Sequence, residues 1–193
     1  ISDGSDHCNV VGNEVGLNTY DGIYVSGCPN TNVTDNLVYA NALNGIMITN
    51  SPQSLIESNR IVGVTGDGLR VATSNDCLII NNNITDDNIG IYIFNSTGGV
   101  LKGNHIGGNG LYGISLDTCL GVSVYGNTFN ANNGADDSYD PLHRQAKDTS
   151  ITGNGWNYSG ALNYHGNMWM DWQLPDGDHN GIYQVVSDVG IWA

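Results

Sequence analysis

Six side chains suited to acid–base chemistry lie close together in the segment ADDSYDPLHRQAKD, residues 135–148. A carboxylate or a histidine can act as a base, a tyrosine as an acid, and an arginine can hold a negatively charged group of a substrate. Lyases and epimerases that act on uronate polysaccharides need this combination. The candidate catalytic residues are Asp136, Asp137, Tyr139, Asp140, His143 and Arg144. The same segment is also compatible with a polar surface loop in which Asp140 pairs with Arg144.

A second candidate site has the oxygen spacing of a calcium loop near the C-terminus. Its candidate ligands are Asp176, Asp178, Asn180 and Ile182, the last through its carbonyl oxygen. Gly181 stands where such loops turn sharply, but the twelfth position is Ser187 rather than a bidentate Glu. The spacing therefore argues against an EF-hand and leaves two alternatives, a simpler calcium loop or a plain turn. Calcium is the only cofactor that the sequence indicates.

The scaffold for these candidates is indicated by a repeat of 22–23 residues. An aliphatic residue lies three positions before each repeated asparagine, and another apolar residue lies two positions after it. A second motif, Gly-aliphatic-x-aliphatic, recurs with the same step, as in GIYV at 22–25 and GIMI at 45–48. The repeated asparagines are Asn13, Asn36, Asn59, Asn82, Asn104, Asn127 and Asn154.

Each repeat contains two or three short strands with alternating apolar residues, and no helical period is visible. Strands of this length bury their apolar side only when coil stacks on coil. The repeat thus predicts an all-β fold, a single-stranded right-handed parallel β-helix of about seven coils, each rising about 4.8 Å. The asparagines are expected to form a hydrogen-bonded ladder at one turn.

We expect one domain over residues 1–193. It comprises regular coils over 8–148, the insertion at 135–148, and a last coil with a cap over 149–193. The end of a β-helix exposes unpaired backbone and an apolar cross-section, which a cap must cover. The aromatic residues expected to form it are Trp156, Trp169 and Trp172. No comparable cap is evident at the N-terminus, so end-to-end stacking of copies into a filament is one expectation.

Aromatic and basic residues also recur at outward positions of the Gly-aliphatic strand. Tyr24, Arg70 and Tyr92 share one column of the repeat and could stack against and hydrogen-bond a glycan. The alternative is that they are ordinary residues of a strand surface. Asp21 and Asp67 precede glycines of the same motif, about two coils apart.

The composition excludes some classes of partner. The net charge of −14, with only five Lys and Arg, argues against a nucleic-acid partner, because phosphate binding needs clustered cations. No apolar run approaches the ~20 residues of a membrane span. The chain begins at Ile1, which we interpret as the start of a mature or excised fragment. An acidic surface of this kind suits a secreted or cell-surface protein.

The sequence resembles the secreted parallel β-helix proteins of the NosD type, which are grouped with carbohydrate-binding and sugar-hydrolase β-helices and are found on archaeal surfaces. The resemblance rests on the repeat and on the closing motifs Gln145-Ala-Lys-Asp148, Asn154-Gly-Trp156, 166–172 and 176–182. It implies a pectate-lyase-like solenoid in which part of the 135–148 insertion leads into the C-terminal cap. The family includes a copper-related periplasmic protein, but no Met- or His-rich cluster here suits copper.

Three functional hypotheses follow. The first is an extracellular structural, adhesive or glycan-binding module without catalysis. The second is a polysaccharide-acting enzyme, a lyase or epimerase before a glycosidase, that uses the 135–148 loop. The third is a subunit that assembles into a filament or surface layer by end-to-end stacking.

Overall fold

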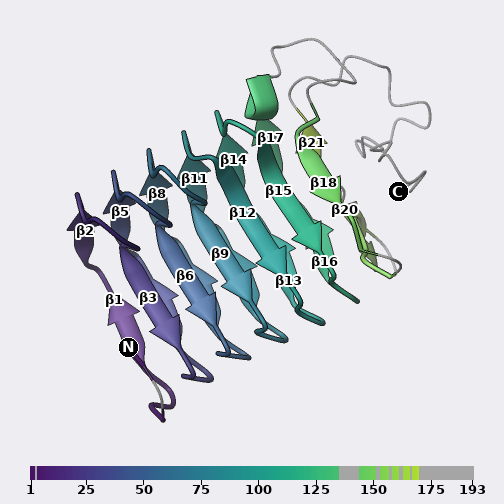
Figure 1. Cartoon of the computed structure of the whole chain (residues 1–193). Coiled ribbons are helices and arrows are strands. Elements are labelled where there is room, and N and C mark those ends of the chain that lie inside the picture. The colour runs from purple at the N-terminus through teal and green to yellow at the C-terminus, as the bar shows by residue number, and fades with distance from the viewer. Residues whose placement is uncertain are drawn as a thin grey trace.

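The protein is a stack of short strands, with β1 to β3 at one end and β18 and β21 at the other (Figure 1). The computed structural model describes residues 1–2, 4–134, 144–150, 153–156, 158–160, 163–165 and 167–169. For residues 158–160, 163–165 and 168–169 only the backbone is described. No helix in these ranges has both the length and the apolar character of a membrane span.

The strands form three parallel sheets that run along the stack. The first sheet contains β1 (Asn9–Val11), β4 (Asn32–Thr34), β7 (Leu55–Glu57), β10 (Leu78–Ile80), β13 (Val100–Lys102) and β16 (Ser123–Tyr125). The second sheet contains β2 (Glu14–Gly16), β5 (Leu37–Tyr39), β8 (Arg60–Val62), β11 (Asn83–Thr85), β14 (His105–Gly107), β17 (Thr128–Asn130) and β21 (Met168–Trp169). The third sheet contains β3 (Ile23–Ser26), β6 (Ile46–Thr49), β9 (Leu69–Ala72), β12 (Ile89–Phe94), β15 (Tyr112–Asp117) and β18 (Ala146–Asp148).

Three short elements lie outside this pattern. The 3₁₀ helix η1 (Asn132–Gly134) follows β17, just before the insertion. The strands β19 (Tyr158–Gly160) and β20 (Asn163–His165) pair antiparallel with each other. They lie between the two closing segments 153–156 and 167–169.

Each strand pairs with its equivalent one repeat later, so like residues fall on like. In the first sheet Val33 pairs with Ile56, and Ile56 with Ile79. The predicted all-β parallel β-helix is therefore confirmed. Only the second sheet reaches seven strands in the described residues, so the stack is slightly shorter than seven complete coils.

The inward side chains form continuous apolar columns inside the stack. Val25, Ile48 and Val71 of the third sheet are almost completely buried, and each contributes about 1.5–3 kcal/mol to stability. The strand motif requires a glycine for a steric reason. A side chain at Gly45 would meet the carbonyl oxygen of Gly68 in the next coil at 2.6 Å. The coils therefore approach too closely at this turn for any larger residue.

An asparagine ladder holds successive coils together at one turn. Asn36 donates from its backbone N and its Nδ2 to Oδ1 of Asn59, at 3.1 and 2.9 Å. Nδ2 of Asn59 also donates to the carbonyl oxygen of Val33 in the preceding coil, at 2.8 Å. One buried amide thereby satisfies two backbone groups of the preceding coil. The members of this ladder are Asn13, Asn36, Asn59, Asn82, Asn104, Asn127 and Asn167.

The ladder ends at Asn167 and not at Asn154, which the repeat places there. Gly155 pairs with Ser123, so Asn154 stands level with Val122 at the start of a strand. Its Oδ1 accepts from the backbone N of Val122 at 3.0 Å. The ladder position lies at the end of that strand, and the chain reaches it only after β19 and β20.

The closing motifs of the sequence terminate the hydrogen-bond ladders of the stack. A second amide ladder runs from Asn109 to Asn132. It ends at Gln145, whose Oε1 accepts from Asn132 Nδ2 at 2.8 Å. Asp148, which is buried, accepts from Ser150 N at 2.9 Å and from Trp156 Nε1 at 3.2 Å. Trp156 is only 8% exposed and packs into the core, whereas Trp169 is described through its pairing with Phe129 and Trp172 lies outside the described residues.

The second amide ladder contains an acid. Asp87 accepts from Val64 N at 2.8 Å through Oδ1, and its own N donates to Asn109 Oδ1 at 3.0 Å. Its Oδ2 is buried without a hydrogen-bond partner among the described residues. In the asparagines that follow in this ladder, the atom equivalent to Asp87 Oδ2 is Nδ2, which donates a hydrogen bond. Asn109 Nδ2, for example, donates to Asn132 Oδ1 at 2.7 Å. Burial, which disfavours the charged carboxylate, raises the pKa of Asp87 to about 7.

Replacing a central ladder residue should destabilise the fold. In Asn59→Leu, the buried groups of Asn36, Asn82 and Val33 lose their partner, so we expect the free energy of unfolding to fall by roughly 1–3 kcal/mol. The measurement is thermal and denaturant unfolding. Asn83→Leu, at an exposed position of β11, is the matched control and should change little. An unchanged melting temperature for Asn59→Leu would mean that the ladder contributes nothing.

Asp87→Asn should stabilise the protein in a pH-dependent way. Between about pH 4 and 7 the unfolded carboxyl is ionised while the folded one keeps its proton, so the wild type loses stability as pH rises through this window. The amide removes that loss. We expect no gain near pH 4 and a gain on the order of 2–4 kcal/mol above pH 7. Asp35→Asn, at an exposed turn between β4 and β5, is the control; a gain that does not vary with pH would contradict this account.

Candidate functional site

The outward face of the third sheet carries a column of large polar and aromatic side chains. Neighbours in this column sit on paired strands, one coil apart, at the ~4.8 Å spacing of a sheet. Tyr24 is the most exposed aromatic residue in it, at 46%. The column consists of Tyr24, Met47, Arg70, Tyr92, Ser115 and Lys147.

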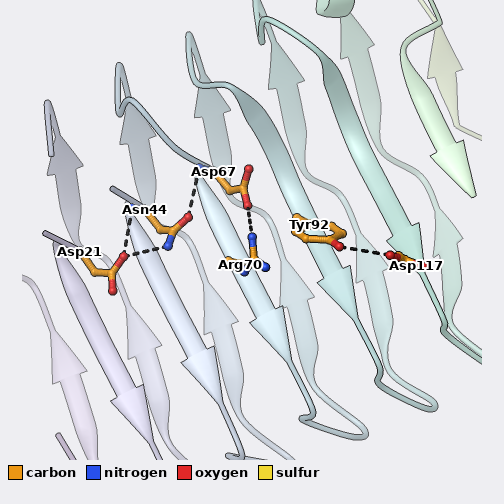
Figure 2. A network of polar contacts seen from close by, with 6 residues as sticks. All are labelled: Asp21, Asn44, Asp67, Arg70, Tyr92 and Asp117. Carbon is orange, nitrogen blue, oxygen red and sulfur yellow. Dashed lines mark hydrogen bonds and ion pairs between the residues drawn. The ribbon is translucent and has the colours of Figure 1, made fainter. Parts of the chain in front are cut away.

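The centre of the column is a fixed polar network (Figure 2). Arg70 Nη1 lies 3.0 Å from Asp67 Oδ2, and the Arg70 guanidinium carbon lies 4.6 Å from the centroid of the Tyr92 ring. The Tyr92 hydroxyl donates to Asp117 Oδ2 at 3.3 Å. Arg70 is therefore held between a carboxylate and an aromatic face, and its orientation is set before any ligand arrives.

The network continues towards the N-terminal coils through the turn before the third sheet. Asn44 donates from its backbone N and its Nδ2 to Asp21 Oδ1, at 3.0 and 2.8 Å. Asp67 N donates to Asn44 Oδ1 at 3.2 Å, which joins this pair to Arg70 (Figure 2). These turn residues are thus positioned by the stacking of the coils.

Towards the C-terminal coils, the network reaches Thr149, which directly follows the 135–148 insertion. Thr149 Oγ1 donates to Asp117 Oδ1 at 3.2 Å. Lys147 Nζ lies 5.6 Å from the centroid of the Tyr112 ring. The column therefore ends in a second pairing of a cation with an aromatic ring.

The protonation of the network is set by burial. Burial raises the pKa of Asp67 above its ordinary value, and the Arg70 guanidinium partly opposes this shift. Partial burial, followed by the charge of Asp117, raises the pKa of the Tyr92 hydroxyl. Tyr92 therefore keeps its proton in neutral solution and acts as a hydrogen-bond donor.

The structure brings together the three predicted glycan-binding residues Tyr24, Arg70 and Tyr92 in one column. Asp117 and Tyr112, which complete the face, were not predicted. Asp117 falls in a column with Ser26, Thr49, Ala72 and Phe94, and this mixture of types gives no repeat signal. Its proximity to the Tyr92 hydroxyl depends on side-chain directions that the sequence does not show.

Most of the predicted catalytic and metal-binding residues lie outside the described residues. Of the insertion candidates only Arg144 is described, and its carbonyl oxygen accepts from Asn133 Nδ2 at 3.2 Å. The candidates that lie outside are Asp136, Asp137, Tyr139, Asp140, His143, Asp176, Asp178, Asn180 and Ile182. Catalysis by the insertion and calcium binding by the C-terminal loop stay predictions.

Comparison with known families identifies the chain. The model of the family described as "Periplasmic copper-binding protein (NosD)" matches residues 1–174. The chain belongs to the NosD family. A search of curated proteins finds no match.

Solved structures similar to this NosD-family chain include two epimerases and a tailspike protein. The periplasmic alginate epimerase AlgG has a TM-score of 0.64 and 20% identity, over 66% of this chain and 35% of that one. The mannuronan C-5 epimerase AlgE4 A-module of Azotobacter vinelandii has a TM-score of 0.60 and 18% identity, over 71% and 39%. The Dettilon tailspike protein has a TM-score of 0.54 and 17% identity, over 79% and 40%. At these identities the similarity shows the shared β-helix fold, and the chain spans less than half the length of each.

The family description names copper, so we compared the possible metal ligands among the described residues with those that copper requires. Copper sites use thiolate, thioether or imidazole ligands, several of which must converge. In the described part of the chain no three His, Cys, Asp or Glu side chains are grouped to hold a metal. The thiols of Cys28 and Cys119 donate instead to the carbonyl oxygens of Ser26 and Ile93, at 3.1 and 3.4 Å. The described residues therefore do not fit a copper site.

Proposed function

We propose that this NosD-family protein is an exported β-helix module that binds glycans on the outward face of the third sheet. The observation that carries the proposal is the fixed arrangement of Arg70, Tyr92 and Asp117 on this face. Tyrosine rings stack against the apolar faces of sugars, and carboxylates and amides accept and donate hydrogen bonds to hydroxyl groups.

Rigidity supports this proposal. Arg70 and Tyr92 stand on strands that are paired on both sides, and they contact each other. Ordering them on binding therefore costs little conformational entropy. A long linear ligand gains most from such a face, because it can contact side chains of several coils at once. The similar fold of an alginate epimerase and a mannuronan C-5 epimerase agrees with a carbohydrate ligand.

An exported location is part of the proposal. The family is described as periplasmic, and one structural neighbour is a periplasmic enzyme. The acidic composition, with a net charge of −14, suits a surface exposed to solvent outside the cytoplasm. Whether the compartment is the periplasm or the cell exterior is decided by fractionation of the native host.

Loss of the two tyrosine rings should abolish glycan binding. On a glycan array, we expect the wild type to bind a defined set of polysaccharides and the variant with Tyr24→Ala and Tyr92→Ala to lose them. Tyr39→Ala, on β5 of the second sheet, is the matched control and should bind like the wild type. Equal binding by all three proteins would place the ligand elsewhere, and binding by none of them would contradict the function.

The second candidate function is a polysaccharide lyase or epimerase that uses the 135–148 insertion. One observation favours it: β18, formed by the last three residues of the insertion, pairs with β15 and brings Lys147 into the outward column beside Ser115. The insertion is thus joined to the glycan-binding face. In this alternative His143 and Tyr139 supply the base and acid, and Arg144 holds the uronate carboxylate.

Turnover of uronate polysaccharides tests the alternative. A lyase would release unsaturated uronides, seen by ultraviolet absorbance, and an epimerase would change the uronate composition, seen by NMR. Either activity should be lost in His143→Ala and kept in His105→Ala, on β14 of the second sheet. The absence of any product from alginate, pectate and hyaluronan would count against an enzyme of this type.

A further inference from the structure

The charge of the outward face restricts the class of glycan that it can bind. The column and the network of Figure 2 contain the carboxylates of Asp21, Asp67 and Asp117. Their cations are Arg70 and Lys147. The face therefore carries more negative than positive groups, and the whole chain has a net charge of −14.

The central cation is already compensated. Arg70 Nη1 lies 3.0 Å from Asp67 Oδ2, and the Asp67 side chain is only 7% exposed. A uronate that approached Arg70 would have to displace a buried carboxylate or add a second negative charge beside it. Removing Asp67 from its partner would leave an unpaired buried charge, which is strongly unfavourable.

The acceptors on this face suit hydroxyl groups. Asp117 is half-buried and accepts from Tyr92 through Oδ2 at 3.3 Å; its Oδ1 accepts from Thr118 at 3.0 Å and from Thr149 at 3.2 Å. A carboxylate oxygen has two lone pairs, so Oδ2 can accept a further O–H donor. A sugar hydroxyl supplies that donor, whereas a uronate carboxylate supplies only another acceptor.

We infer that the ligand of this face is a neutral polysaccharide that lies along the stack, across the coils from Tyr24 to Tyr92. The inference rests on the glycan-binding function proposed above. The two tyrosines of the column, Tyr24 and Tyr92, stand three coils apart, about 14 Å at sheet spacing. A chain of several sugar units can contact both rings at once.

Isothermal titration calorimetry with two matched ligand sets tests this inference. One set contains neutral gluco- and manno-oligosaccharides, and the other contains oligomannuronates and oligogalacturonates of equal length. We expect the neutral set to bind with an affinity that does not change with salt, because no net charge is neutralised. We expect Tyr92→Ala to weaken this binding at least about fivefold. The matched control is Tyr125→Ala on the first sheet, where Lys102 Nζ lies 5.8 Å from the ring centroid, and it should bind like the wild type.

A charge variant shows whether oligouronates bind weakly because the face repels them or because they fit it poorly. Asp117→Asn keeps the size of the side chain and removes one negative charge. We expect it to raise the affinity for oligouronates severalfold at low salt, with the gain lost at high salt.

Tighter binding of oligouronates than of neutral oligosaccharides by the wild type, weakening as salt rises, would overturn the inference and leave the glycan-binding function intact. Binding of neither set would overturn the glycan-binding function itself. Melting temperatures of all variants establish that each is folded.

Discussion

The fold depends on one requirement: the backbone groups at each turn must find a partner in the neighbouring coil. The described strands contain only two to six residues, so much of each coil is turn, where sheet hydrogen bonds end. The buried asparagines supply the missing partners. Each accepts two hydrogen bonds from the coil before it and donates to the coil after it, and so fixes the step at 22–23 residues. Apolar columns then stack because the step is constant.

The outward face inherits its order from this constraint. A constant step places Tyr24, Arg70 and Tyr92 in one column, and the close contact of coils at Gly45 draws the turns together. Side chains on adjacent coils can then form persistent pairs, such as Arg70 with Tyr92. The face is therefore a product of the scaffold, and its polar groups are oriented without a dedicated loop.

The sequence predicts the fold well because the repeat directly encodes the register of the sheets. It also predicts the column of Tyr24, Arg70 and Tyr92, since a column is a repeat position. It fails where the register is interrupted. Asn154 has the right flanking residues for the ladder, but the chain reaches the ladder position only at Asn167, after an added hairpin. Asp117 could not be predicted as a partner of Tyr92, because its role depends on side-chain directions in neighbouring coils.

The residues that terminate the ladders have a consequence for how such a chain changes length in evolution. Each of these residues accepts a hydrogen bond from a partner in the final coils: Gln145 from Asn132, Asp148 from Trp156, Ser150 from Cys119 and Asn167 from Asn127. Duplication or loss of a whole repeat nearer the N-terminus leaves every one of these contacts unchanged. The outward face can therefore become longer or shorter by single repeats during evolution, while the residues that terminate the ladders stay the same. Homologues with different numbers of coils would then differ in the length of polymer they span, and not in how they end.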